Sequence, residues 1–176
     1  MAMASGIIWK RNSPFLPVEI DGSLGAWELL IDACELAQGN PTDPNYFTPV
    51  TSLLYLDSYL DYLLVNFYMH NADWGSNGNN WRAFRRRGTT DKFRFTIWDA
   101  EIAMSPAALA DNSTYFDGNK GALLPHSLLK DREDYKAAFQ QRIDLHFHTP
   151  GGVFSVDGTN HQITKSPASS RRPLMT

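Results

Sequence analysis

Residues 68–84 read YMHNADWGSNGNNWRAF, and they place an oxygen-rich loop between a hydrophobic segment and a pair of short strands. Before the loop, residues 52–70 carry Leu and aromatic residues at three- and four-residue spacing, which predicts a helix buried on most sides. After it, WRAFRRR (81–87) and KFRFTIW (92–98) flank GTTD, which predicts a β-hairpin. The predicted order is therefore a buried helix, a polar loop and a hairpin.

The rest of the chain adds helices around this centre. A first helix is expected at 24–38, with Ser23 as its cap and Trp27, Leu30, Ile31 and Cys34 on one face. Residues 40–49 read as a loop, and a last helix is expected at 131–148 with an apolar stripe of Tyr135, Phe139 and Ile143. In the hairpin, alternation places Phe93, Phe95 and Ile97 on a buried face. The predicted class is α+β, mostly helical with a small antiparallel hairpin.

Both ends of the chain differ in composition from its middle. Residues 1–22 contain several prolines and are expected to be a leader or extended segment, and the Ser- and Pro-rich residues 153–176 are expected to be disordered. The folded domain is expected at 23–152. Lys10 is the sole lysine in the sequence before the long helix.

Composition excludes several classes of protein. The 176 residues are 43% hydrophobic and 20% charged, which indicates a soluble globular domain rather than disorder. The net charge of −3 argues against nucleic acid as a partner, and residues 85–87, all Arg, read as a solvated strand edge. No run approaches the roughly 20 apolar residues of a membrane span. A single cysteine, Cys34, excludes an intramolecular disulfide.

Oxygen ligands are expected to gather at one end of the hairpin. A hairpin folds back on itself, so Asp99, after its second strand, should return to the Asn-rich loop before its first. This brings together Asp73, Asp99 and either Asn79 or Asn80, and such oxygens suit a hard cation such as Mg²⁺. Contact through a metal or a water predicts the Asp73 and Asp99 carboxylates within about 8 Å of each other.

The motifs in this order resemble the CotH kinase family, which is named for spore-coat protein H. The resemblance rests on NADWGSNGNNWRAFRR followed by KFRFTIWDAE. The preceding LDSYLDYLLVNFYMHN and the later LPHSLLKDREDYKAAFQQRIDLHF are similar to the family's flanking segments, so the resemblance covers residues 24–152. It implies the C-terminal lobe of a protein kinase, which uses ATP with Mg²⁺ or Mn²⁺ and has a protein Ser/Thr hydroxyl as acceptor. It also implies an extracellular or cell-surface location.

The resemblance assigns a role to individual residues. Asp73 matches the catalytic Asp that orients the acceptor hydroxyl. The metal ligands implied are Asn80, Asp99 and Glu101, and the nucleotide-binding positions implied are Asn71, Trp74 and Trp98. The match departs from the kinase pattern in spacing, because kinases place the Asn five residues after the Asp, whereas here Asn79 and Asn80 follow Asp73 by six and seven.

A second departure concerns the nucleotide's phosphates. A kinase covers them with a Gly-rich loop and a strand lysine in an N-terminal lobe, and neither is recognisable before the long helix. Lys10 and Lys92 do not lie where the kinase order would put this lysine. We therefore expect the isolated chain to transfer little or no phosphate.

Other readings of the same residues remain open. One is a non-catalytic interaction or scaffold module that keeps the kinase-like fold, and another is a hydrolase that uses Asp99 and Glu101 as an acid/base pair. Arg82, Arg85 and Arg94 are expected to pair with the acids of this region, in a structural role. The five histidines are expected to be isolated surface or half-buried residues.

Overall fold

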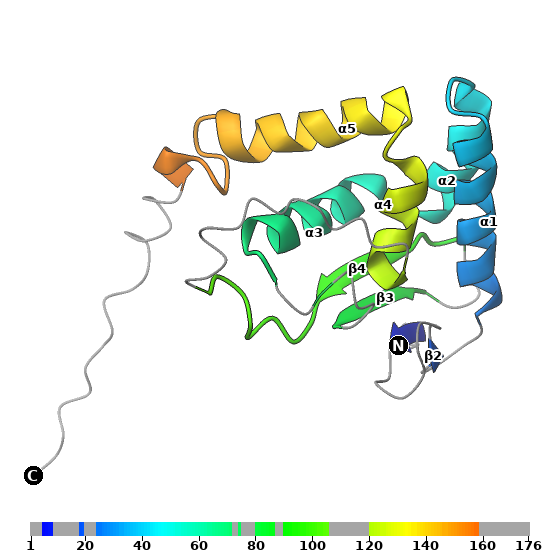
Figure 1. Ribbon diagram of the computed structural model, residues 1–176, viewed down its shortest axis with the longest axis horizontal. Coiled ribbons are helices and arrows are strands. Elements are labelled where there is room, and N and C mark those ends of the chain that lie inside the picture. The colour runs from blue at the N-terminus through cyan, green and yellow to red at the C-terminus, as the bar shows by residue number, and fades with distance from the viewer. Residues whose placement is uncertain are drawn as a thin grey trace, which may run out of the picture. The chain divides into compact units, whose positions relative to one another are not determined.

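The computed structural model describes residues 5–8, 18–19, 24–71, 74, 80–86, 90–105 and 120–158. The chain divides into two compact units, Met1–Ala138 and Phe139–Thr176. Figure 1 shows the helices and strands as ribbons, coloured from the N-terminus to the C-terminus. The α-helices are α1 (Gly25–Gly39), α2 (Phe47–Leu53), α3 (Leu56–Tyr68), α4 (Leu124–Leu129) and α5 (Glu133–Ile143). The strands are β1 (Ser5–Ile8), β2 (Val18–Glu19), β3 (Trp81–Arg85) and β4 (Arg94–Ile97). The α+β class predicted from the sequence is confirmed.

The first unit contains one antiparallel sheet with the strand order β2-β1-β3-β4. The predicted hairpin is confirmed as β3 and β4, with Trp81 opposite Ile97 and Phe84 opposite Arg94. On its other side β3 pairs with β1, where Ser5 lies opposite Arg85. Two stretches of the predicted leader or extended segment are therefore strands.

Aromatic side chains fill the space between the hairpin and the helices. The ring of Trp27 on α1 lies 5.3 Å from that of Trp81, and the ring of Tyr59 on α3 lies 4.8 Å from that of Phe95. Phe93 and Phe95 are buried, as alternation predicted. The prediction for Ile97 is wrong, since 37% of it is exposed. It is the last residue of β4, where the covering layer ends.

The predicted single helix at 52–70 is instead two helices, α2 and α3. The break falls at Leu54, which has an extended backbone and forms a β-bridge with Phe93. The amide of Tyr55 donates to the Phe93 carbonyl at 3.0 Å, and the amide of Phe93 donates to the Leu53 carbonyl at 2.7 Å. At this point hydrogen bonds to the residue before β4 take the place of hydrogen bonds within a helix. The predicted loop at 40–49 is also corrected, because it contains the 3₁₀ turn η1 (Pro44–Tyr46) and the start of α2.

The first helix forms where it was predicted. It begins at Gly25, and its cap position is Leu24, which makes no side-chain capping bond. Ser23, the predicted cap, lies outside the described residues. Trp27, Leu30 and Cys34 are buried as predicted. Ile31 is only half-buried, and the apolar face is completed by Ala33 and Ala37 instead.

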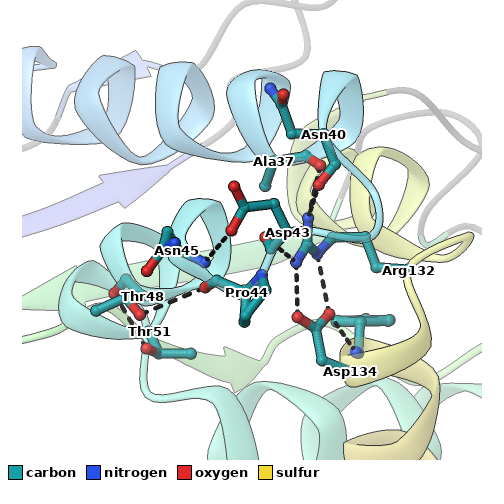
Figure 2. A network of polar contacts seen from close by, with 10 residues as sticks. Ala37, Asn40, Asp43, Pro44, Asn45, Thr48, Thr51, Arg132 and Asp134 are labelled. Carbon is teal, nitrogen blue, oxygen red and sulfur yellow. Dashed lines mark hydrogen bonds and ion pairs between the residues drawn. The ribbon is translucent and has the colours of Figure 1, made fainter.

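A buried arginine ties the C-terminal end of α1 to the chain before α5. The Arg132 guanidinium donates to the carbonyls of Ala37 at 2.8 Å, Asn40 at 2.6 Å and Asp43 at 3.1 Å (Figure 2). It also forms a two-point ion pair with Asp134, with contacts of 2.9 and 2.6 Å. Only 1% of Arg132 is exposed, so its charge is satisfied inside the fold by one carbonyl of the last turn of α1, by two carbonyls of the chain that follows, and by Asp134.

The second unit is short and contains the end of α5. The predicted helix at 131–148 corresponds to α5 and the following π-helical turn η4 (Asp144–His148). Of its predicted stripe, Tyr135 is buried, whereas Phe139 and Ile143 are half-buried. Phe154 packs on Phe147 with ring centroids 4.9 Å apart, so the chain turns back on η4. Residues 159–176 lie outside the described part.

Candidate functional site

Asn80 and Asp99 meet at one end of the hairpin. Asn80 directly precedes β3, and Asp99 lies two residues after the end of β4. The Asn80 side-chain Nδ2 donates to the backbone carbonyl of Asp99 at 3.5 Å. The structure thus brings together one of the two candidate Asn residues and the Asp that were predicted to converge here.

Both residues adopt the left-handed backbone conformation, with φ of 56° at Asn80 and 55° at Asp99. Residues with a Cβ rarely adopt this backbone region, although Asn and Asp tolerate it better than most. Strained positions persist where the surrounding structure holds them, and they gather at functional sites. Here Trp81, which follows Asn80, pairs with Ile97, two residues before Asp99, and this pairing constrains both positions.

The segment after Asp99 returns to the C-terminal end of α3. The amide of Met104 donates to the Met69 carbonyl at 2.7 Å, and Met104 is itself left-handed, with φ of 55°. Glu101 lies in the intervening turn and is exposed. No contact joins Glu101 to Asn80 or Asp99 in the described part of the chain, so its role as a metal ligand stays a prediction.

Asn71 anchors the start of the oxygen-rich loop in the core. It is fully buried, its amide donates to the Asn66 carbonyl at 3.2 Å, and its Nδ2 donates to Asn66 Oδ1 at 3.1 Å. Asn66 Nδ2 continues the chain of bonds to the Tyr62 carbonyl at 2.8 Å. The Oδ1 of Asn71 is buried and accepts no hydrogen bond from any described residue. Asn71 therefore fixes the start of the loop to α3.

Trp74 holds the same loop three residues later. Its ring is fully buried, and its Nε1 donates to the Tyr62 hydroxyl at 2.6 Å. Asn71 and Trp74 lie on either side of Asp73 in the sequence, and each is hydrogen-bonded to a residue of α3. Asp73 and Asn79 lie outside the described residues, so the predicted approach of Asp73 to Asp99 stays a prediction. The nucleotide contacts expected of Asn71 and Trp74 also stay predictions. In the structure both side chains are buried and hold the loop against α3.

Arg82 and Trp98 lie side by side next to the Asn80–Asp99 contact. Arg82 is opposite Thr96 on the sheet face turned away from the aromatic core, and Trp98 is two residues further along. The Arg82 guanidinium carbon stacks 3.0 Å from the centre of the Trp98 ring, which is 45% exposed. The sequence indicated structural ion pairs for three arginines, and Arg94 forms one with Asp91 at 3.1 Å.

Arg82 does not form the ion pair that was expected of it. Within the described residues no carboxylate or carbonyl accepts a hydrogen bond from its guanidinium, and its Nε is buried without a partner. Stacking on an exposed ring stabilises by about 0.5–1 kcal/mol. A buried donor left without a partner costs about 1–3 kcal/mol. Packing alone therefore gives Arg82 little reason to occupy this position.

The donor set of this region fits a hard cation. Asp99 is exposed, and its carboxylate accepts no hydrogen bond from the described residues. The Asn80 side chain, which donates through Nδ2, also presents an amide oxygen. Carboxylate and amide oxygens are the ligands that Mg²⁺ and Mn²⁺ take in proteins. Among the described residues no three His, Cys, Asp or Glu side chains form a cluster, so the fit rests on Asn80 and Asp99.

Comparison with known families assigns the chain. The family described as CotH kinase protein matches residues 10–151. The chain belongs to the CotH kinase protein family. The match covers most of the chain and includes every site residue discussed above. No curated protein and no solved structure matches the sequence.

Membership of the CotH family gives the chain a kinase-like function at the family level. It also extends the resemblance seen in the sequence toward the N-terminus, from residue 24 to residue 10. In the described part of the chain, no helix has the length and apolar character needed to cross a bilayer.

Proposed function

We propose that this CotH family chain carries the metal-binding and acceptor side of a protein kinase site. In this proposal ATP is the phosphate donor, and a Ser or Thr hydroxyl of a protein is the acceptor. The observation that carries the proposal is the contact between Asn80 and Asp99, at 3.5 Å, at the end of a hairpin that follows the Asp73 loop. Protein kinases use an Asp, then an Asn and then a second Asp in this order.

Each residue has a defined task in the proposed reaction. Asp73 accepts a hydrogen bond from the acceptor hydroxyl and orients it in line with the phosphorus. Asn80 and Asp99, with Glu101 as a further candidate, hold Mg²⁺ or Mn²⁺. The bound cation supplies positive charge to the phosphate oxygens. Phosphoryl transfer depends mainly on such positioning and charge, so this chain's residues need to supply little covalent chemistry.

The strained backbone supports a task for these residues beyond packing. Of the four described non-glycine residues with positive φ, three lie on the two chain segments that bound this end of the hairpin, namely Asn80, Asp99 and Met104. A sequence under no functional demand relieves such strain with glycine. The oxygen-bearing side chains at Asn80 and Asp99 are consistent with ligands held in place at some cost in stability.

Metal binding is the first test, because the named residues supply only one side of a nucleotide site. Thermal unfolding is followed with EDTA and with millimolar Mg²⁺ or Mn²⁺. We expect the metals to stabilise the parent chain, by about 1.4 kcal/mol when the free metal is near tenfold its dissociation constant. Asp99→Asn should lose the response, and Glu35→Gln, which neutralises an exposed carboxylate on α1, should keep it.

Nucleotide binding separates the proposal from its rivals. Calorimetric titration with ADP and Mg²⁺ should give binding that is weakened by Asp99→Asn. A folded parent chain that binds neither metal nor nucleotide would instead support the scaffold module. Hydrolysis of glycosides that depends on both Asp99 and Glu101 would support the carboxylate-pair hydrolase.

A further inference from the structure

Neither the kinase order nor the packing explains the position of the Arg82 side chain. It lies on the face of the sheet opposite the aromatic core, stacked on the half-exposed ring of Trp98. Arg94, on the same face, is occupied by Asp91 at 3.1 Å and by the Tyr55 ring at 3.9 Å. Arg82 makes no ion pair with any described carboxylate, and so it keeps its charge available.

The position of Arg82 places that charge beside the proposed metal ligands. Arg82 is two residues after Asn80 along the chain, so their Cα atoms are at most about 7 Å apart. Its stacking partner Trp98 directly precedes Asp99. Despite this proximity no ion pair joins Arg82 to Asp99 in the described structure. The guanidinium is therefore close to the carboxylate site without being neutralised by it.

The chemistry of a guanidinium identifies the ligand that fits. Arginine presents several N–H donors in a planar fork, which matches two phosphate oxygens. Stacking on Trp98 fixes the plane of the fork, so less rotamer freedom is lost when an anion binds. We propose that Arg82 binds a phosphate group of the nucleotide, next to the cation held by Asn80 and Asp99. This inference rests on the proposed function, because the nucleotide is the source of the phosphate.

Arg82 would thus supply a cation that Lys92 does not supply. Lys92 precedes β4, whereas Asp99 follows it, so the whole strand lies between them, and the Lys92 ammonium instead lies 5.5 Å from the Tyr55 ring. Lys10 lies outside the described residues. The Arg82 guanidinium is at the correct end of the hairpin, on the side of the sheet that the core does not cover.

The test separates phosphate binding from metal binding by using pyrophosphate in EDTA. Calorimetric titrations at low, constant ionic strength compare pyrophosphate, ADP and adenosine, each with EDTA and with Mg²⁺. The variants are Arg82→Gln, which removes the charge, and Arg82→Lys, which keeps the charge but loses the fork. The matched control is Arg85→Gln, at the other end of β3. Circular dichroism and thermal unfolding confirm that each variant is folded.

We expect Arg82→Gln to weaken pyrophosphate and ADP binding by about 10- to 100-fold, as for a lost hydrogen bond to a charged group. Adenosine, which has no phosphate, should bind the variant and the parent equally. Arg82→Lys should lose part of the affinity, and Arg85→Gln none of it.

The failure of each proposal has its own signature. If Arg82→Gln binds pyrophosphate and ADP as well as the parent does, the Arg82 inference is overturned and the proposed metal site is untouched. If Arg82-dependent pyrophosphate binding persists in EDTA but neither metal nor Asp99→Asn affects ADP binding, the inference stands and the proposed metal-dependent function fails. A folded parent that binds neither pyrophosphate nor ADP overturns both.

Discussion

Asn80 and Asp99 share the same left-handed backbone conformation and are joined by a hydrogen bond. Each has a φ near 55°, and the Asn80 side chain bonds to the Asp99 carbonyl at 3.5 Å. A left-handed conformation costs a residue with a Cβ roughly 1–2 kcal/mol relative to the right-handed region. The two candidate ligands are thus positioned at an energetic cost to the fold, a cost that a glycine would not bear.

Asp99→Gly should therefore separate stability from metal binding. Glycine relieves the left-handed strain but adds freedom to the unfolded chain, so the net gain is expected to be up to about 1 kcal/mol without metal. The same variant loses the carboxylate, so Mg²⁺ should no longer stabilise it. Urea unfolding with EDTA and with Mg²⁺ measures both effects.

Met104→Gly is the matched control for strain. Met104 has the same φ of 55°, and 60% of it is exposed, so its side chain contributes little to packing. It should gain a similar stability without metal and keep the response to Mg²⁺. Loss of stability in both glycine variants would contradict the strain interpretation of this end of the hairpin.

Gly121 is predicted to be irreplaceable because it lies against Trp81. Its φ is 53°, and a Cβ there would lie 2.5 Å from Trp81 Nε1 and 3.1 Å from two ring carbons. Trp81 is 1% exposed and precedes Arg82, so it cannot move without disturbing the site-bearing strand. Gly121→Ala should destabilise by about 2–4 kcal/mol, from overpacking and strain together, as measured by urea unfolding.

Gly151→Ala isolates the part of that loss that comes from the backbone. Gly151 also has a positive φ, of 81°, but no heavy atom lies within 4 Å of a Cβ built there. Its substitution should cost only about 1 kcal/mol. If both alanine variants lose the same stability, crowding against Trp81 is not the cause.

The sequence was most informative where one pattern fixed one local structure. Alternation around residues 88–91 predicted the hairpin, and the return of its second strand predicted that Asp99 would lie near the Asn-rich loop, as its contact with Asn80 now shows. It failed where distant segments compete for the same backbone. The break at Leu54 depends on bonds with Phe93, which no helical periodicity can reveal. Arg82 was misjudged because its stacking on Trp98 depends on the register of the hairpin.

Arg132 is a second feature that sequence patterns could not predict, because its partners lie about 90 residues earlier in the chain. Its guanidinium satisfies three carbonyls and Asp134 inside the fold. Arg132→Met keeps much of the volume but removes the charged donor. The three carbonyls keep only their longer backbone bonds of 3.2–3.3 Å, and Asp134 loses its ion-pair partner. We expect a loss of about 3 kcal/mol, as for the removal of one partner from a buried ion pair. Urea unfolding provides the measurement.

Asp134→Asn is the companion variant for Arg132. The Asp134 side chain is 32% exposed, so solvent compensates part of the lost charge, and Asn still accepts a hydrogen bond. Its cost should be well below that of Arg132→Met. Equal losses in the two variants would show that the ion pair, rather than the carbonyl contacts of Figure 2, dominates the network.

Cys34 should make the fold sensitive to alkali. Burial, with a smaller contribution from Glu35, raises the pKa of its thiol from 9.0 to about 12. Above pH 9 the unfolded chain releases this proton while the folded chain retains it, so the stability is complete below pH 9 and is lost as the pH rises toward about 12. The free energy of unfolding falls by about 1.4 kcal/mol per pH unit for one such group.

Burial also raises the pKa of Tyr59 and Tyr135, and the stability that these two groups contribute is lost only above the usual tyrosine pKa of 10.0. Urea unfolding of Cys34→Ala at a series of pH values should therefore show a flat profile up to about pH 10 and a decline beyond it. A Cys34→Ala profile that falls as steeply as that of the parent between pH 9 and 10 would rule out Cys34 as the group responsible.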